Sequence, residues 1–304
     1  MGKIAFVFSG QGAQYPGMGK DLAERSAAAR AVFAALDEIR PGTSEQCFSA
    51  DMEELCKTIN TQPCMFAVEL AAAAALRESG IQADLAAGFS LGELGALTYG
   101  GAMELSTGFR LVCKRAEHMQ KAAELHDTGM AAVLKLGEET VREICAQLAD
   151  TYPVNFNCPG QVTVAAAKPQ LAPLLAAVKA QGGRAVPLKV NAAFHSPFMS
   201  TAARDFAVDL EHFDLKEPKI PIYANRTAEP YGADVAALLA GQIDHPVLWE
   251  KSVRAMIAAG ADTFLELGPG RTLCGLIAKT DPNVRVFATE KAEDFEKVLQ
   301  EICG

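Results

Sequence analysis

The sequence lacks any apolar run long enough to span a membrane. Its longest apolar stretch, residues 70–76, is rich in alanine and lies between Glu69 and Arg77. A membrane-spanning helix needs about 20 consecutive apolar residues. After Lys3 the chain continues with a short strand-like run instead of the longer apolar segment of a secretory signal. These absences predict a soluble, cytoplasmic protein that makes no contact with a membrane.

Paired cysteine motifs are also absent. The chain has eight cysteines, and no two of them are spaced as Cys-x-x-Cys. Structural zinc sites and redox-active disulfides use such closely spaced pairs. We therefore expect buried free thiols in a reducing compartment and no metal site.

Positive charge is scarce relative to negative charge. The 28 Lys and Arg residues, against 37 Asp and Glu residues, give a formal net charge of −9. Nucleic acids and anionic membranes select proteins with a basic surface, so this balance argues against both as partners. Docking of an acidic protein would need a local basic patch.

Alternating strand and helix patterns predict an α/β fold. Half of the 304 residues are hydrophobic, which is enough for one large core with a smaller inserted unit. Residues 4–8 are continuously apolar, as in a parallel strand that is covered on both faces. A helical pattern follows over residues 21–39. Further strands are expected at 220–224, 263–267 and 284–288.

The middle of the chain predicts a different unit. Its expected elements are strand 130–136, helix 138–149, strands 154–157 and 161–165, helix 169–180 and strand 185–190. This β-α-β-β-α-β order is that of the ferredoxin-like unit. We therefore predict a large subdomain made of residues 1–126 and 194–304, and a small ferredoxin-like subdomain made of residues 127–193. The two junctions would leave a cleft, where ligands tend to bind.

One serine is placed as a nucleophile. The run Gly-Phe-Ser-Leu-Gly-Glu at residues 88–93 follows three apolar residues and precedes a helix-forming segment. In this context a Gly-x-Ser-x-Gly motif lifts the serine hydroxyl clear of the sheet. An ordinary strand-to-helix turn also explains the motif, because glycine and serine are common. Ser90 therefore needs support from other residues.

Only five histidines are available as the base that a serine nucleophile requires. His118, His126 and His212 lie in polar or charged surroundings, so we expect them to be solvated. His245 lies in a turn. His195 instead follows the last predicted strand of the small subdomain, at the rim of the expected cleft. A general base and a hydrogen-bonded loop histidine are both consistent with that position.

One arginine is expected to point into the protein. At 100° per residue Arg115 shares a helix face with Val112 and Met119, whereas Arg110 and Lys114 lie on the opposite face. A buried guanidinium needs an anionic partner, because an unpaired buried charge is very costly. That partner is either an internal Asp or Glu, or a carboxylate that arrives on an acyl substrate.

Seven motifs occur along the chain in one order. They are Gly-Gln-Gly-Ala-Gln at 10–14, the serine motif at 88–93, Arg115, Asn-Phe-Asn-Cys-Pro-Gly-Gln at 155–161, Ala-Phe-His-Ser at 193–196, Gln242 ahead of His-Pro-Val at 245–247, and Glu-Leu-Gly-Pro-Gly at 266–270. Together they resemble the malonyl-CoA:acyl carrier protein transacylases of fatty-acid and polyketide synthesis. The resemblance runs from about residue 3 to residue 280.

The resemblance implies a fold and an activity. The fold is an α/β-hydrolase-like core with a parallel sheet and an inserted ferredoxin-like subdomain. The activity is a ping-pong transfer of a malonyl group from malonyl-CoA to the phosphopantetheine thiol of acyl carrier protein. No cofactor of the chain's own is implied, because the partner carries the phosphopantetheine.

The resemblance also implies roles for individual residues. Ser90 would match the nucleophile and His195 the general base. The main-chain carbonyl of Gln242 would orient the histidine. Arg115 would hold the malonyl carboxylate.

Three more positions would shape the acyl site of such an enzyme. The backbone N–H groups of Gln11 and Leu91 would form the oxyanion hole. The ring of Phe194 would leave little room for an α-methyl group, and one methyl in a tight pocket is worth only about 1–3 kcal/mol. The resemblance thus implies a preference for malonyl over methylmalonyl groups.

The chain departs from the family pattern at two positions. Phe89 stands where the usual motif has a histidine, and Ser9 stands where a proline usually precedes Gly-Gln-Gly. Phenylalanine cannot form the hydrogen bonds of an imidazole, so rate and fine specificity are open. The other interpretations are a serine acyl hydrolase on the same fold, against which Arg115 argues, a specialised polyketide acyltransferase, and a non-catalytic docking protein.

Overall fold

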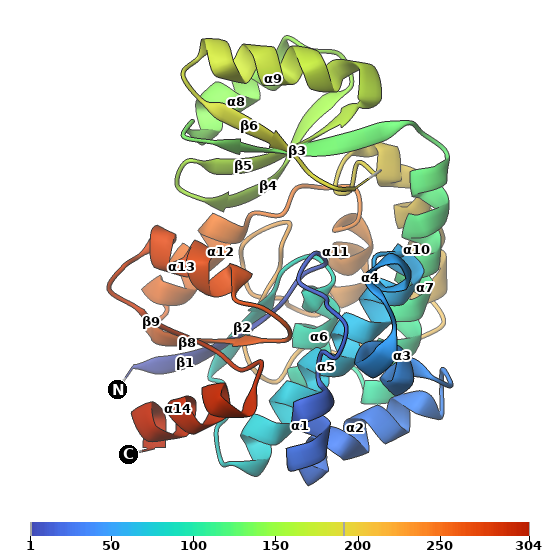
Figure 1. Cartoon of the computed structure of the whole chain (residues 1–304), viewed down its shortest axis with the longest axis vertical. Helices are drawn as coiled ribbons and strands as arrows, with labels where there is room; N and C mark the ends of the chain where they lie inside the picture. Colours follow the sequence, from blue (N-terminus) through green and yellow to red (C-terminus); the bar gives the residue numbers. More distant parts are fainter. Residues whose placement is uncertain (1, 191, 304) are drawn as a thin grey trace.

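Two separate β-sheets organise the protein, whose computed structural model describes residues 2–190 and 192–303 (Figure 1). The larger sheet is parallel, with strand order β7-β2-β1-β8-β9, and the smaller sheet is antiparallel, with order β4-β5-β3-β6. The strands of the larger sheet are β1 (Lys3–Phe8), β2 (Leu85–Gly88), β7 (Ile222–Tyr223), β8 (Ala261–Leu267) and β9 (Arg285–Ala288). Those of the smaller sheet are β3 (Thr128–Leu134), β4 (Thr151–Cys158), β5 (Gln161–Ala167) and β6 (Arg184–Pro187). The predicted α/β class, with a parallel sheet and a second small unit, is confirmed.

Helices fill the connections between these strands. Those before the small sheet are α1 (Lys20–Arg25), α2 (Ala27–Asp37), α3 (Thr43–Ser49), α4 (Met52–Leu55), α5 (Thr58–Glu78), α6 (Gly92–Tyr99) and α7 (Leu105–Glu124). Those within it are α8 (Glu138–Ala146), the 3-10 turn η1 (Lys168–Gln170) and α9 (Leu171–Ala180). Those after it are η2 (Pro197–Met199), α10 (Ser200–Leu210), α11 (Val235–Gly241), α12 (Trp249–Ala258), α13 (Thr272–Thr280) and α14 (Ala292–Cys303).

The first strand is buried on both faces, as its continuous apolar sequence predicts. Phe6 and Phe8 belong to the core that includes α2, α5 and α7. Ala5 and Val7 belong to a second core, on the face covered by α12 and α13. Because successive side chains of a strand alternate between its faces, a strand between two helical layers needs apolar residues at every position.

The small sheet has the ferredoxin-like arrangement. Its strands follow the order β-α-β-β-α-β along the chain, and the second and third strands, β4 and β5, form an antiparallel hairpin. Helices α8 and α9 cover the outer face, which lies at the top of Figure 1. The other face packs against Ala193, Phe194 and Phe198, so the segment that follows the insert lies directly beneath its sheet.

Several element boundaries differ from those expected. The helix predicted over 21–39 is divided into α1 and α2, because Ser26 adopts an extended conformation and its hydroxyl accepts the N–H of Ala29 as an N-cap. Strand β7 is shorter than predicted, and strand β6 ends before residue 190. The subdomain boundaries remain a prediction, and their terminal residues 1 and 304 lie outside the described part.

Helix α5 runs through the core and carries a buried acid. In the described part of the chain no helix, α5 included, is long and apolar enough to cross a membrane. Glu69 is 0% exposed, and neither of its carboxyl oxygens has a hydrogen-bond partner among the described residues. A Cβ placed on Gly95 of α6 would lie 2.7 Å from Glu69 Oε2. Burial raises the pKa of Glu69 well above its ordinary value.

This acid makes stability depend on pH. In the unfolded chain Glu69 loses its proton near the ordinary pKa of 4.5, whereas the folded protein keeps it. The part of the unfolding free energy that depends on the Glu69 proton is therefore complete below about pH 4.5. It is lost as pH rises, by up to about 1.4 kcal/mol per pH unit. We expect Glu69→Gln to reduce the fall in unfolding free energy between about pH 5 and about pH 8, measured by chemical denaturation. Glu53→Gln, at an exposed position, is the control, and an equal fall in both variants would contradict this assignment.

Candidate active site

Ser90 lies on a tight turn between β2 and α6. Its φ is 56°, in the left-handed region that residues with a side chain rarely adopt. The flanking glycines allow this turn. A Cβ on Gly88 would lie 1.9 Å from the backbone of Gly92, and a Cβ on Gly92 would lie 2.4 Å from the carbonyl oxygen of Phe8. Ser90 is thus placed, half-buried, at the carboxyl end of a parallel strand.

His195 lies against this serine. Its Nε2 is 2.7 Å from Ser90 Oγ, and its Nδ1 is 2.9 Å from the main-chain carbonyl oxygen of Gln242. A carbonyl can only accept, so Nδ1 carries the proton and donates it to Gln242. Nε2 is then the acceptor for the Ser90 hydroxyl. The three residues form a hydrogen-bonded series that can move a proton from Ser90 to His195.

The environment keeps His195 neutral. The side chain is 3% exposed, and its φ is 61°. Burial is the main cause that lowers its pKa to about 4, and the positive charge of Arg115 lowers it further. A neutral imidazole with a free Nε2 lone pair is the form that a general base requires.

Arg115 points inward from the middle of α7. It is 1% exposed; its Nη1 donates to Gln62 Oε1 at 2.8 Å, and its Nη2 donates to Gln242 Oε1 at 2.7 Å and to Ser90 Oγ at 3.3 Å. The inward orientation expected from the helix pattern is present. Burial lowers its pKa to about 10 and the charge of Glu93 opposes this shift, so the guanidinium is protonated at neutral pH.

The internal ion pair considered for Arg115 is not found. Among the described residues no carboxylate lies within ion-pair distance of its guanidinium. Its Nε atom is buried and has no acceptor there. A buried cation with a free donor and only neutral acceptors can take up an anionic group.

Gln242 forms hydrogen bonds with all three of these residues. Besides the carbonyl contact to His195, its Oε1 accepts from Arg115 and its Nε2 donates to the carbonyl oxygen of Ser90 at 2.5 Å. The sequence pointed only to its main-chain carbonyl. Its side chain is 1% exposed, and it fixes the distance between the guanidinium and the serine turn.

The other histidines lie elsewhere. His126 and His212 are exposed, and His245 is half-buried beside Asp244. The expectation that His118 is solvated is wrong. Its side chain is 15% exposed, and its Nε2 is 2.6 Å from Asp209 Oδ2, because α10 packs against α7 and covers it. Of the five, His195 is the one beside Ser90.

Of the two backbone amides expected to form an oxyanion hole, that of Leu91 directly follows Ser90, and that of Gln11 follows Gly10, where a Cβ would lie 3.0 Å from the carbonyl oxygen of Phe89. Within the described chain, neither the N–H of Gln11 nor that of Leu91 donates to a protein acceptor. The Gln11 loop is held in place, since Gln14 Oε1 accepts the N–H of Gly12 at 2.7 Å and the Gln11 side chain lies 3.5 Å from Thr58 Oγ1. Free N–H groups of this kind are available to an oxygen that gains negative charge.

Three buried polar residues, whose roles the sequence did not reveal, hold the serine turn. Asn225 Oδ1 accepts the N–H of Ser90 at 2.7 Å, and its Nδ2 donates to the carbonyl of Gly88 at 2.5 Å. Glu93 Oε1 accepts the N–H of Asn225 at 2.8 Å and the hydroxyl of Tyr231 at 2.9 Å. Burial raises the pKa of Glu93 to about 7 although these hydrogen bonds oppose the shift. Glu93 was part of the serine motif, and Asn225 follows a predicted strand, where polar residues often reach a site.

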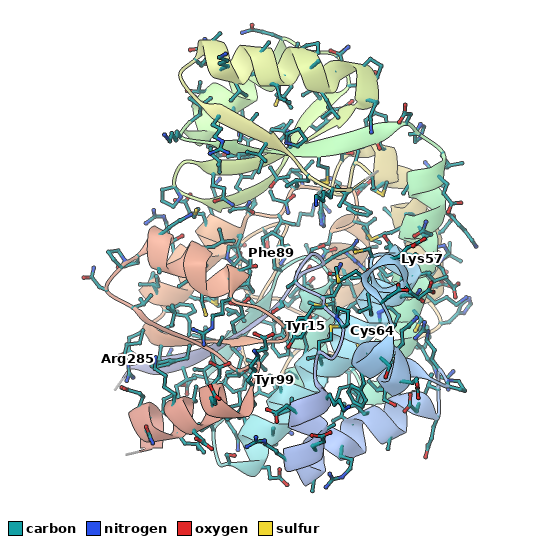
Figure 2. The ribbon with its side chains drawn as sticks, in the orientation of Figure 1. Tyr15, Lys57, Cys64, Phe89, Tyr99 and Arg285 are labelled. Atoms are coloured by element: carbon teal, nitrogen blue, oxygen red, sulfur yellow. The ribbon has the colours of Figure 1, made fainter. Side chains whose placement is uncertain are left out.

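Two phenylalanines directly precede Ser90 and His195 in sequence. Phe194 is half-buried and packs between the large core and the inner face of the small sheet. Figure 2 shows Phe89 in the middle of the molecule, between the two sheets. Its ring meets Trp249 edge-on, with centroids 5.4 Å apart. Trp249 Nε1 is buried without an acceptor among the described residues, and Phe89 offers it none.

Metal-ligating side chains do not gather at this site. In residues 2–190 and 192–303 no group of three His, Cys, Asp or Glu side chains is arranged to hold a metal ion. The titratable groups near Ser90 are His195, Arg115 and Glu93, and their arrangement suits acyl transfer through a serine.

Comparisons with known proteins agree with this chemistry. Residues 5–291 match the family model described as acyl transferase domain. The malonyl CoA-acyl carrier protein transacylase of Bacillus subtilis is 36% identical over 310 residues, which is 99% of this chain and 97% of that protein.

Solved structures are similar over the whole chain. A malonyl CoA-acyl carrier protein transacylase from Clostridium perfringens has 34% identity and a TM-score of 0.96, with 99% of this chain and 97% of that chain covered. A malonyl-transacylase solved in complex with its type II PKS acyl-carrier protein has 32% identity and a TM-score of 0.94, with 98% and 99% covered.

The electrostatics of the site can be measured directly. We expect the His195 imidazole to titrate near pH 4, well below the ordinary 6.5, because of burial and the Arg115 charge. NMR of the protein with labelled histidine, with His195→Gln to assign the signal, measures this pKa. Arg115→Met should raise it, and titration of His195 at the ordinary value in the wild type would contradict the proposed environment.

Proposed function

The chain belongs to the acyl transferase domain family, and on this premise we propose that it transfers a malonyl group from malonyl-CoA to the phosphopantetheine thiol of acyl carrier protein. The observation that carries the substrate assignment is Arg115, a buried cation 3.3 Å from Ser90 Oγ that has only neutral acceptors. An acyl group with its own carboxylate supplies the missing anion.

The first half of the reaction acylates Ser90. His195 Nε2 takes the hydroxyl proton while Oγ bonds to the thioester carbonyl carbon. The N–H groups of Gln11 and Leu91 donate to the oxyanion, and removal of one such donor typically costs about 10²–10³ in rate. The C–S bond then breaks, and His195 returns the proton to the sulfur, so that CoA leaves as a thiol.

The second half reverses these steps with another thiol. The phosphopantetheine thiol of the carrier protein gives its proton to His195, and its sulfur bonds to the carbonyl carbon of malonyl-Ser90. The ester C–O bond breaks, and Ser90 Oγ recovers the proton. The Nδ1–H bond to the Gln242 carbonyl keeps the imidazole in the tautomer that both halves need.

Phe194 bears on which acyl groups the site accepts. We place Phe194 against the α-carbon of the acyl group, where an α-methyl would be disfavoured by about 1–3 kcal/mol. The reaction uses no cofactor of this chain, because the serine, the histidine and the partner's thiol account for each bond and proton. We assign the enzyme to the cytoplasm.

Acyl-enzyme formation tests the function. We expect intact-mass spectrometry to show a malonyl adduct on the wild type after incubation with malonyl-CoA and no adduct on Ser90→Ala. Arg115→Ala should slow malonyl loading by about 10- to 100-fold, the effect of losing a charged hydrogen bond, and lower the ratio of malonyl to acetyl loading. Equal acetyl and malonyl loading in the wild type would contradict the carboxylate contact. Malonate release that is faster than malonyl transfer to phosphopantetheine-bearing acyl carrier protein would favour the alternative interpretation, a serine acyl hydrolase on the same fold.

Asn225 tests the support of the serine turn. Asn225→Ala removes the acceptor of the Ser90 N–H and the donor to the Gly88 carbonyl. We expect kcat for malonyl transfer to fall by about 10- to 100-fold with KM little changed, since a small misplacement of the nucleophile is costly. Asn283→Ala, at an exposed position, is the matched control. Unchanged kcat in a folded Asn225→Ala variant would show that the turn keeps its geometry unaided.

A further inference from the structure

We propose that Gln62 is a positioning residue that sets the preference of this site for acyl groups with a terminal carboxylate. Gln62 does so by giving Arg115 an acceptor that fixes the guanidinium without neutralising it. The inference rests on the proposed malonyl transfer and adds to it the side chain that maintains the selectivity.

The contacts of Gln62 are those of an oriented amide. Its side chain is 1% exposed, and its Oε1 accepts from Arg115 Nη1 at 2.8 Å. Its Nε2 lies 3.4 Å from Met119 Sδ, and Met119 is one turn beyond Arg115 on α7. With the nitrogen against a sulfur and the oxygen against the cation, the amide has one favourable orientation.

For the choice of acyl group, the neutrality of the Gln62 amide matters more than the geometry of its hydrogen bond to Arg115. A carboxylate in place of the Gln62 amide would pair with Arg115 within the protein, as buried arginines usually do. Both side-chain amides on Arg115, from Gln62 and Gln242, are neutral. The guanidinium is thus held in position while its full charge remains available to a carboxylate on the substrate.

Gln62 is also the amide that can be altered without disturbing the reacting atoms. Gln242 contacts Ser90 and His195 as well as Arg115, so a change there affects nucleophile, base and cation together. The hydrogen bonds of Gln62 go to Arg115 and Met119.

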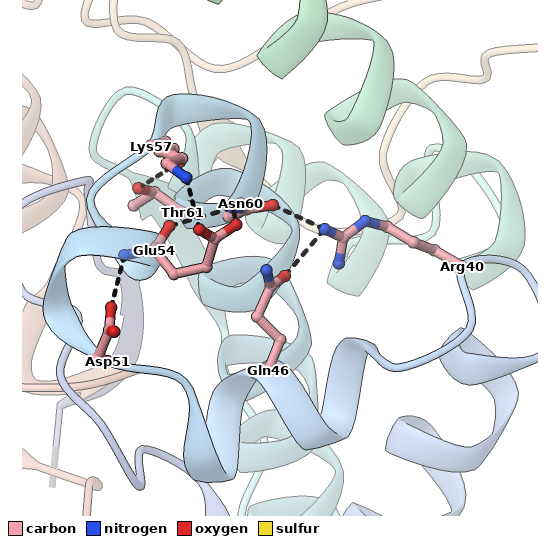
Figure 3. A network of polar contacts seen from close by, with 7 residues as sticks. All are labelled: Arg40, Gln46, Asp51, Glu54, Lys57, Asn60 and Thr61. Atoms are coloured by element: carbon pink, nitrogen blue, oxygen red, sulfur yellow. Dashed lines mark hydrogen bonds and ion pairs between the residues drawn. The ribbon is translucent and has the colours of Figure 1, made fainter.

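A polar network anchors the start of α5, in the turn that precedes Gln62 (Figure 3). Asn60 accepts from Arg40 Nη2 at 2.9 Å and donates to Glu54 Oε1 at 2.7 Å. Thr61 Oγ1 donates to the carbonyl of Leu55 at 2.5 Å. These bonds fix the turn immediately before Gln62, so its amide is presented to Arg115 by a rigid helix end.

The test is Gln62→Glu, which replaces the neutral acceptor with an anion of nearly the same shape. Acylation of Ser90 from malonyl-CoA and from acetyl-CoA is followed separately by rapid quenching and intact-mass spectrometry. We expect the malonyl rate to fall by about tenfold or more, because the new carboxylate pairs with Arg115 and repels the substrate carboxylate. The acetyl rate should stay at its wild-type value or rise.

The chain offers a matched control in Gln46→Glu. Gln46 Oε1 also accepts from an arginine at 2.8 Å, here Arg40 Nη2 (Figure 3), and among the described residues it forms no hydrogen bond to Arg115, Ser90 or His195. We expect its malonyl-to-acetyl ratio to equal that of the wild type. Gln62→Met, which removes the acceptor without adding charge, is the second variant should Gln62→Glu fail to fold. It should raise KM for malonyl-CoA and leave acetyl loading unchanged.

The outcomes separate this inference from the proposed function. An unchanged malonyl-to-acetyl ratio in folded Gln62→Glu or Gln62→Met, or an equal loss of both rates, would overturn the role of Gln62. A wild type that forms no malonyl adduct would instead overturn the proposed function, whatever the variants do.

Discussion

A buried positive charge whose hydrogen-bond acceptors are all neutral is the constraint around which the site is arranged. Arg115 is 1% exposed, and its acceptors are two amide oxygens and a serine hydroxyl. Removing a guanidinium from water costs free energy that neutral acceptors offset only in part. The negative charge of ionised Glu93 opposes the lowering of the Arg115 pKa by burial, but burial raises the pKa of Glu93 itself to about 7. The site therefore favours an anionic group beside Ser90.

The second constraint is backbone strain at the serine turn and at the histidine beside it. Ser90 and His195 both have positive φ, at 56° and 61°, and residues with side chains hold such values only where the surroundings determine them. Asn225 bonds the N–H of Ser90 and the carbonyl of Gly88, and Gln242 bonds the carbonyl of Ser90 and the imidazole of His195. These supports come from segments far apart in sequence, so the strain is maintained by the tertiary fold.

The difference between local patterns and contacts that join distant segments explains what the sequence could predict. The serine turn and the inward face of Arg115 follow from glycine spacing and helix periodicity, which are local. The division of a predicted helix at Ser26 depends on a side-chain cap that competes with helix continuation. The contacts of Asn225 and Gln62 span 135 and 53 residues, and no local pattern encodes them. The sequence could therefore indicate the central residues of the candidate site, while most of the residues that hold them in place required the structure.

The charge of Arg115 also couples substrate binding to the strength of the base. After burial, that charge is the next cause that lowers the pKa of His195 to about 4, so the free site holds a weak base. A carboxylate paired with Arg115 opposes the same charge, which raises the proton affinity of His195. An acyl group without a carboxylate leaves the base weak. We therefore expect a substrate carboxylate paired with Arg115 to favour the transfer of the Ser90 proton to His195 as well as binding.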